Sequence, residues 1–218
     1  MKSMKSSSLL RNSVIFGAPL SYLLIGAIHP MDLDVGDDPG LYIGIHVVQL
    51  FSIWGMALML WFLTAGIENS AARLARFAVL PYAIFYAAFD SIAGIAMGLV
   101  VHEANGMAAA DQQAVQRLVE LLLLTPSGVA FYLASGLTWL LAAGAAILSL
   151  RGRAPGGALA LLLLGAAVFA IAHPFPPGPV GMTLFIAGLA WLQLGPNASK
   201  QPDALTTTPV PAARLVSS

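Results

Sequence analysis

The sequence contains no cysteine, few charged residues and only three lysines, and each scarcity excludes a class of function. Without cysteine in 218 residues, the chain has no disulfide exchange, no thiolate nucleophile and no thiolate-bound metal or iron–sulfur cluster. Lys2, Lys5 and Lys200 lie outside every long apolar run, which excludes a Schiff base inside a bilayer. Only 9% of the residues are charged while 58% are hydrophobic, so the partner is a lipid bilayer and not a nucleic acid.

Long apolar runs are abundant, and several reach the roughly 20 residues that a helix needs to cross a hydrocarbon core. They predict an all-α integral membrane protein, a six-transmembrane-helix bundle within residues 13–195. The predicted spans are 13–29, 41–65, 76–101, 127–150, 156–173 and 180–195.

Basic residues gather between alternate spans. Nine of the ten lie before span 1, between spans 2 and 3, between spans 4 and 5, or after span 6, and only Arg117 lies on the other side. Positive charge is retained in the cytoplasm, so we expect both termini there, in a multi-pass protein of the cell membrane. The nine are Lys2, Lys5, Arg11, Arg73, Arg76, Arg151, Arg153, Lys200 and Arg214.

The two ends of the chain have simple compositions. The first 30 residues resemble a signal peptide in charge and hydrophobicity but lack a small-x-small cleavage site, so we expect residues 1–12 to be a retained cytoplasmic N-terminus. Residues 196–218 are rich in Pro, Thr, Ser and Ala, which predicts a disordered cytoplasmic tail.

The segment from Asp111 to Leu124 has a polar face and a Leu/Val face, and it is followed by Thr125 and Pro126. Thr125 suits the cap of a new helix and Pro126 its first turn. The pattern predicts a short outer interfacial helix, or a kinked extension of span 4, acting either as a connector or as a lid over a site.

All four histidines fall at or near the outer ends of predicted spans. His29, His102 and His173 end spans 1, 3 and 5, and His46 lies about 7 Å into span 2. Imidazole binds zinc, copper and haem iron, so one layer of four rings predicts a metal ion (zinc or copper) or haem site. The alternative is that each histidine merely ends a helix at the interface, since no pair shows the i, i+4 ligand spacing.

Five acidic residues lie close to this layer in sequence and could complete a metal shell or orient the rings. The segment from Met31 to Gly40 fails the EF-hand pattern, because Gly36 and Ile43 occupy ligand positions, so we interpret it as a solvated turn that attracts cations. The acidic residues are Asp32, Asp34, Asp37, Asp38 and Glu103.

Asp90 stands alone in the middle of span 3, where an ionised carboxylate costs about 2.5 to 3.5 kcal/mol. We therefore predict a catalytic or proton-carrying role, with neutral interhelical bonding as the alternative. Gly94 and Gly98 follow at four-residue steps, a stripe that allows another helix or a second copy of the chain to approach closely. Because Asp90 is about 18 Å of helix from His102, we expect it to lie outside the coordination shell of the histidines.

The sequence leaves three functions open, and whether the protein is an enzyme stays undecided. The first is a small membrane protein whose outward-facing His/Asp site binds a metal ion or haem, with an enzymatic activity as one outcome. The second is a proton- or cation-coupled small-molecule carrier that uses Asp90. The third is a non-catalytic assembly partner, or a homo-oligomer, that packs through Gly94 and Gly98.

Overall fold

The computed structural model describes residues 2–30, 32–171, 173 and 176–194, and within this part of the chain every regular element is helical. The predicted tail at 196–218 lies outside the described residues. The elements are α1 (Lys2–Ile28), α2 (Pro39–Thr64), α3 (Ser70–Asp90), the π-helix η1 (Ser91–Ala96), α4 (Met97–Ala104), α5 (Ala109–Leu124), α6 (Pro126–Ser149), α7 (Gly156–Ile171) and α8 (Pro177–Leu194).

Five of these helices are long and apolar enough to cross a membrane, and α7 is a shorter apolar helix of 16 residues. The five are the segment of α1 from Leu9 to Ile28, α2, the continuous helix Ser70–Ala104 formed by α3, η1 and α4, α6, and α8. The prediction of a polytopic, all-helical membrane protein is confirmed. Of the six predicted spans, five correspond to helices long enough to cross a membrane, and the fifth span corresponds to the shorter helix α7.

Local sequence explains where the helices begin. The Asp38 side chain accepts a hydrogen bond from the Gly40 amide, and Pro39 occupies the first turn of α2. Thr125 accepts from the Gly128 amide at the start of α6, as the sequence predicted. This cap separates α5 from α6, so the segment after Asp111 is a helix of its own and not an extension of span 4.

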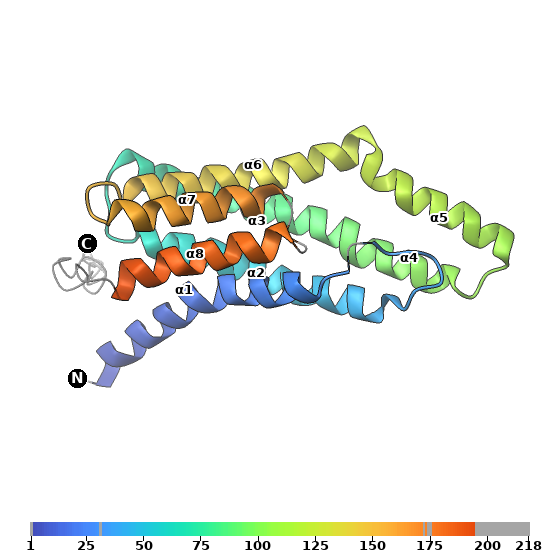
Figure 1. The fold of residues 1–218 in the computed structure, drawn as a ribbon, viewed down its shortest axis with the longest axis horizontal. Coiled ribbons are helices and arrows are strands. Elements are labelled where there is room, and N and C mark those ends of the chain that lie inside the picture. The colour runs from blue at the N-terminus through green and yellow to red at the C-terminus, as the bar shows by residue number, and fades with distance from the viewer. Residues whose placement is uncertain (1, 31, 172, 174–175, 195–218) are drawn as a thin grey trace, which may run out of the picture.

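The helices differ greatly in length, and this difference positions the site. The continuous helix Ser70–Ala104 has 35 residues, about 52 Å at 1.5 Å per residue. By the same measure α7 is about 24 Å long. In Figure 1, α4 and α5 consequently extend well past the ends of α7 and α8.

The core lies where α3 packs on α6, α7 on α8, and α1 on α2. Trp139 is fully buried at its centre, and its Nε1 donates a hydrogen bond of 2.9 Å to the Ala166 carbonyl oxygen. This bond ties α6 to α7 in the bilayer-spanning part of the bundle. The other large, fully buried side chains are Tyr22, Tyr82, Phe169, Phe185, Ile15, Ile53, Met56, Met59, Leu60, Leu162 and Met182.

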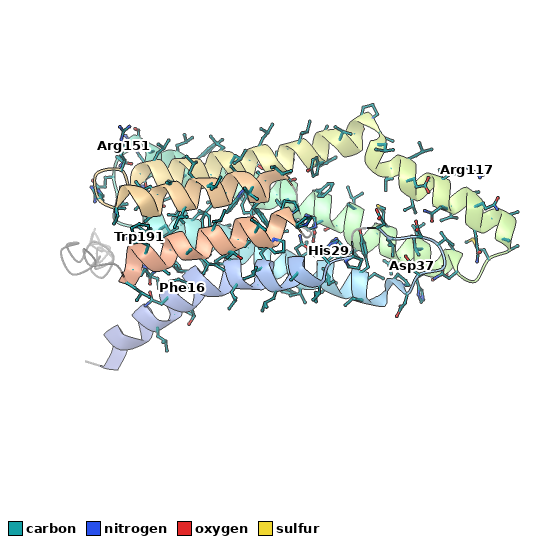
Figure 2. All side chains as sticks on the ribbon, viewed as in Figure 1. Phe16, His29, Asp37, Arg117, Arg151 and Trp191 are labelled. Atoms are coloured by element: carbon teal, nitrogen blue, oxygen red, sulfur yellow. The ribbon has the colours of Figure 1, made fainter. Side chains whose placement is uncertain are left out.

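The two ends of the bundle carry different charges. The α2–α3 and α6–α7 loops lie at the end where α1 begins and α8 finishes (Figure 1). Figure 2 shows Arg151 at that end, with Arg117 and Asp37 toward the other and His29 between them. Arg151 and the acidic Asp37 therefore lie toward opposite ends of the bundle.

The acidic segment before α2 is held against α4 and α5. Gln116 Oε1 accepts from the Val35 amide at 2.7 Å, and Gln116 Nε2 donates to Asp34 Oδ1 at 2.7 Å. Asn105 Oδ1 accepts from the Gly36 amide, also at 2.7 Å. The segment is therefore a largely exposed turn that side-chain hydrogen bonds hold against this end of the molecule.

Candidate metal centre

Three histidines from three separate helices meet inside the bundle. His29 follows the last residue of α1, His46 lies in α2 and His173 lies just beyond α7. The ring centroid of His29 is 4.8 Å from that of His46 and 5.0 Å from that of His173. One ligand nitrogen from each ring lies within 4.8 Å of the other two, so the three rings form a group that could hold a metal ion.

The backbone sets which nitrogen of two rings is free. His46 Nδ1 lies 2.8 Å from the Tyr42 carbonyl oxygen, and His29 Nδ1 contacts the Pro30 carbonyl oxygen. A carbonyl oxygen only accepts, so each Nδ1 carries the proton and each Nε2 presents a lone pair. Both rings are thus held in the tautomer that ligates a metal through Nε2.

The two free nitrogens face one another. His29 Nε2 and His46 Nε2 are 3.2 Å apart, and both side chains are buried. Two lone pairs at this distance repel unless a cation lies between them. In a tetrahedral site with Zn–N bonds of about 2.0 to 2.1 Å, two ligand nitrogens are about 3.3 Å apart, close to the separation found here.

Glycines make room for the cluster. A Cβ atom on Gly94 of η1 would overlap the His46 ring, and one on Gly26 of α1 would lie 2.7 Å from the His173 carbonyl oxygen. Gly178 of α8 approaches the same carbonyl. Sequence reasoning did not find Gly26 and Gly178, because nothing in their sequence neighbourhood indicates which backbone will approach them.

No family model, curated protein or solved structure matches the chain.

His102 does not join the other three histidines. It is exposed on α4, in the part of the long helix that extends past α7 and α8. The predicted layer of four rings is thus a cluster of three in the structure. The reason is that His102 ends a 35-residue helix, so the end of that helix does not lie level with the ends of α1 and α7.

Asp90 lies beside the cluster, although it is not a member of the group of three close ligand residues. Its Oδ1 is 3.9 Å from His46 Nε2, and the residue is 1% exposed. The distance of about 18 Å along the helix separates Asp90 from His102 only. Because α2 and the long helix both extend past the ends of α1 and α7, the level of Asp90 coincides with the ends of α1 and α7.

Three polar side chains on neighbouring spans, Gln49, Ser52 and Thr138, have partners other than Asp90 or none among the described residues. Ser52 accepts from Ser21 at 2.8 Å, and Thr138 donates to the Ala134 carbonyl oxygen of its own helix. The Gln49 amide is fully buried, and neither its nitrogen nor its oxygen has a hydrogen-bond partner among the described residues. The same is true of both Asp90 oxygens.

The glycine stripe faces the chain itself. Gly94 is covered by the His46 ring, and a Cβ on Gly98 would lie 2.5 Å from Cγ1 of Ile43. Both glycines are buried against α2. This face is therefore occupied within one molecule, so it does not serve the predicted contact with a second copy or another membrane protein.

Proposed function

We propose that this polytopic membrane protein binds one transition-metal ion, zinc or copper, through His29, His46 and His173 toward the outer end of the bundle. The observation that carries the proposal is the pair of Nε2 lone pairs 3.2 Å apart, each fixed by a carbonyl bond on the opposite ring nitrogen. Three neutral imidazoles that converge from separate helices are a typical ligand set for these ions.

The short separations favour a single ion over haem. Haem presents its iron within a large flat ring, whereas a bare metal ion fits directly between converging imidazoles. Here the two nitrogens are 3.2 Å apart with a third ring beside them, an arrangement that surrounds a small ion from one side.

The matched variants for a test are His46→Ala and His102→Ala. Protein purified in detergent should contain one zinc or copper ion per chain by elemental analysis. The His102→Ala variant should keep the metal, because this side chain is exposed and outside the cluster, whereas His46→Ala should lose it. A wild-type protein that stays metal-free after incubation with each ion would refute the proposal.

A second candidate function, a proton- or cation-coupled carrier, is favoured by the contact between Asp90 and His46 at 3.9 Å. In this case a proton shared by His29 and His46 removes the lone-pair repulsion, and Asp90 balances its charge. The test is proton uptake by liposomes that contain the protein. Metal-free wild-type protein that moves protons, with the movement lost in Asp90→Asn, supports the carrier over the metal site.

For the membrane orientation, we propose that the end of the bundle with the α2–α3 and α6–α7 loops faces the cytoplasm and the histidine cluster lies toward the outside of the cell membrane. Arg73, Arg76, Arg151 and Arg153 support this orientation, since they lie in or next to the two loops at the end where α1 begins.

A further inference from the structure

The histidine group supplies three ligands, and the described residues place no fourth ligand equally close. The group whose ligand atoms all lie within 4.8 Å of one another consists of His29, His46 and His173. Asp90 adjoins one member of this group, His46, at 3.9 Å, but does not converge with all three. A tetrahedral ion held here would therefore keep one open coordination position, as catalytic zinc sites do.

Asp90 is not placed to orient the His46 ring. A carboxylate usually does so by accepting the N–H of a ligating imidazole. In this protein the Nδ1 proton of His46 is donated to the Tyr42 carbonyl oxygen, and its Nε2 faces His29. His46 has no N–H left for Asp90, so the partner of this carboxylate is not the ring.

The described residues offer Asp90 no hydrogen-bond partner. Both of its oxygens are buried without a hydrogen bond from any described residue, and both amide atoms of Gln49, three residues after His46 in α2, are in the same condition. Buried polar atoms are nearly always bonded, and exceptions mark places where a molecule from outside the chain completes the bonding. Next to a metal site with three ligands, such a molecule would occupy the open coordination position.

We propose that the open coordination position takes a small, neutral molecule that donates hydrogen bonds, such as water or an alcohol, and that Asp90 is the acceptor that holds it. This inference rests on the proposed metal site. A metal dication at the cluster favours the ionised form of the neighbouring Asp90. Asp90 then selects for hydrogen-bond donors and against anions, because an anion at the open position would lie next to a buried like charge.

The test uses the full-length protein in detergent, loaded with Co²⁺, whose visible bands report its coordination. Azide, a small anion, is titrated into the wild type, Asp90→Asn and Asp111→Asn. Asp111 lies exposed on α5 and provides the matched control for loss of one carboxylate. We expect one cobalt per chain in all three proteins, and azide binding at least tenfold tighter in Asp90→Asn than in the other two.

Equal azide affinity in the wild type and Asp90→Asn would overturn the inference. So would loss of cobalt from Asp90→Asn alone, because Asp90 would then be a ligand that closes the site. If Asp90→Asn does not accumulate, Asp90→Ser removes the same charge with a smaller side chain. A wild type that binds no cobalt would instead refute the metal site itself, which keeps the two failures distinct.

Discussion

Gly94→Ala tests whether the packing of η1 against α2 holds the metal ligand in place. The added Cβ would overlap the His46 ring, which is buried and bonded through Nδ1 to its own helix. The ring cannot move aside without breaking this bond, so either α2 and η1 separate or the Nε2 atom turns away from His29.

The expected effects of Gly94→Ala on stability and on zinc affinity follow from two typical magnitudes. Overpacking a buried site costs about 1 to 3 kcal/mol, and disturbing the residues that orient a metal ligand lowers affinity about 10- to 100-fold. We therefore expect the dissociation constant for zinc to rise by about 10- to 100-fold in Gly94→Ala. The thermal unfolding temperature should fall as well, because the strain is present with or without metal.

The assay is competition for zinc between the purified protein and a chelating dye, with Gly144→Ala as the control. A Cβ on Gly144 would meet nothing within 4 Å, so this variant adds the same methyl group to a helix without a collision. Alanine also favours helix over glycine. If Gly94→Ala binds zinc as tightly as Gly144→Ala, the site does not depend on the η1–α2 contact and the reasoning is wrong.

Three further predictions concern the rest of the molecule. Asp90→Asn should change the unfolding temperature of the metal-free protein little, because a carboxyl buried without a partner among the described residues is held neutral and asparagine has nearly the same shape; a large change would show that Asp90 carries a charge in the folded protein. Trp139→Phe should destabilise the bundle by about 1 to 3 kcal/mol by leaving the Ala166 carbonyl oxygen without its donor, measured by chemical denaturation against Trp191→Phe, whose side chain is largely exposed. Labelling of single cysteines introduced at Gly36 and Pro177 should occur from outside the cell, and at Arg73 and Arg153 only after permeabilisation; the reverse pattern would contradict the proposed orientation.

The sequence alone was sufficient for the class of protein and for most helix ends. Hydropathy indicates whether a segment is apolar enough to span a bilayer. Helix caps such as Thr125 form hydrogen bonds to residues no more than three positions away. Both are therefore properties of local sequence. Spans 1 and 5 run in the same direction, so the order of the spans likewise placed His29 and His173 at the same end of the bundle.

Only the tertiary structure decided which polar residues meet. Sequence position measures depth along one helix, but it does not measure how far that helix is displaced along its neighbours. The long helix Ser70–Ala104 extends past α7, so His102 leaves the cluster while Asp90 arrives beside His46. Gly94 likewise serves the His46 ring and not a second molecule, because contacts between helices depend on packing over distances that no local pattern records.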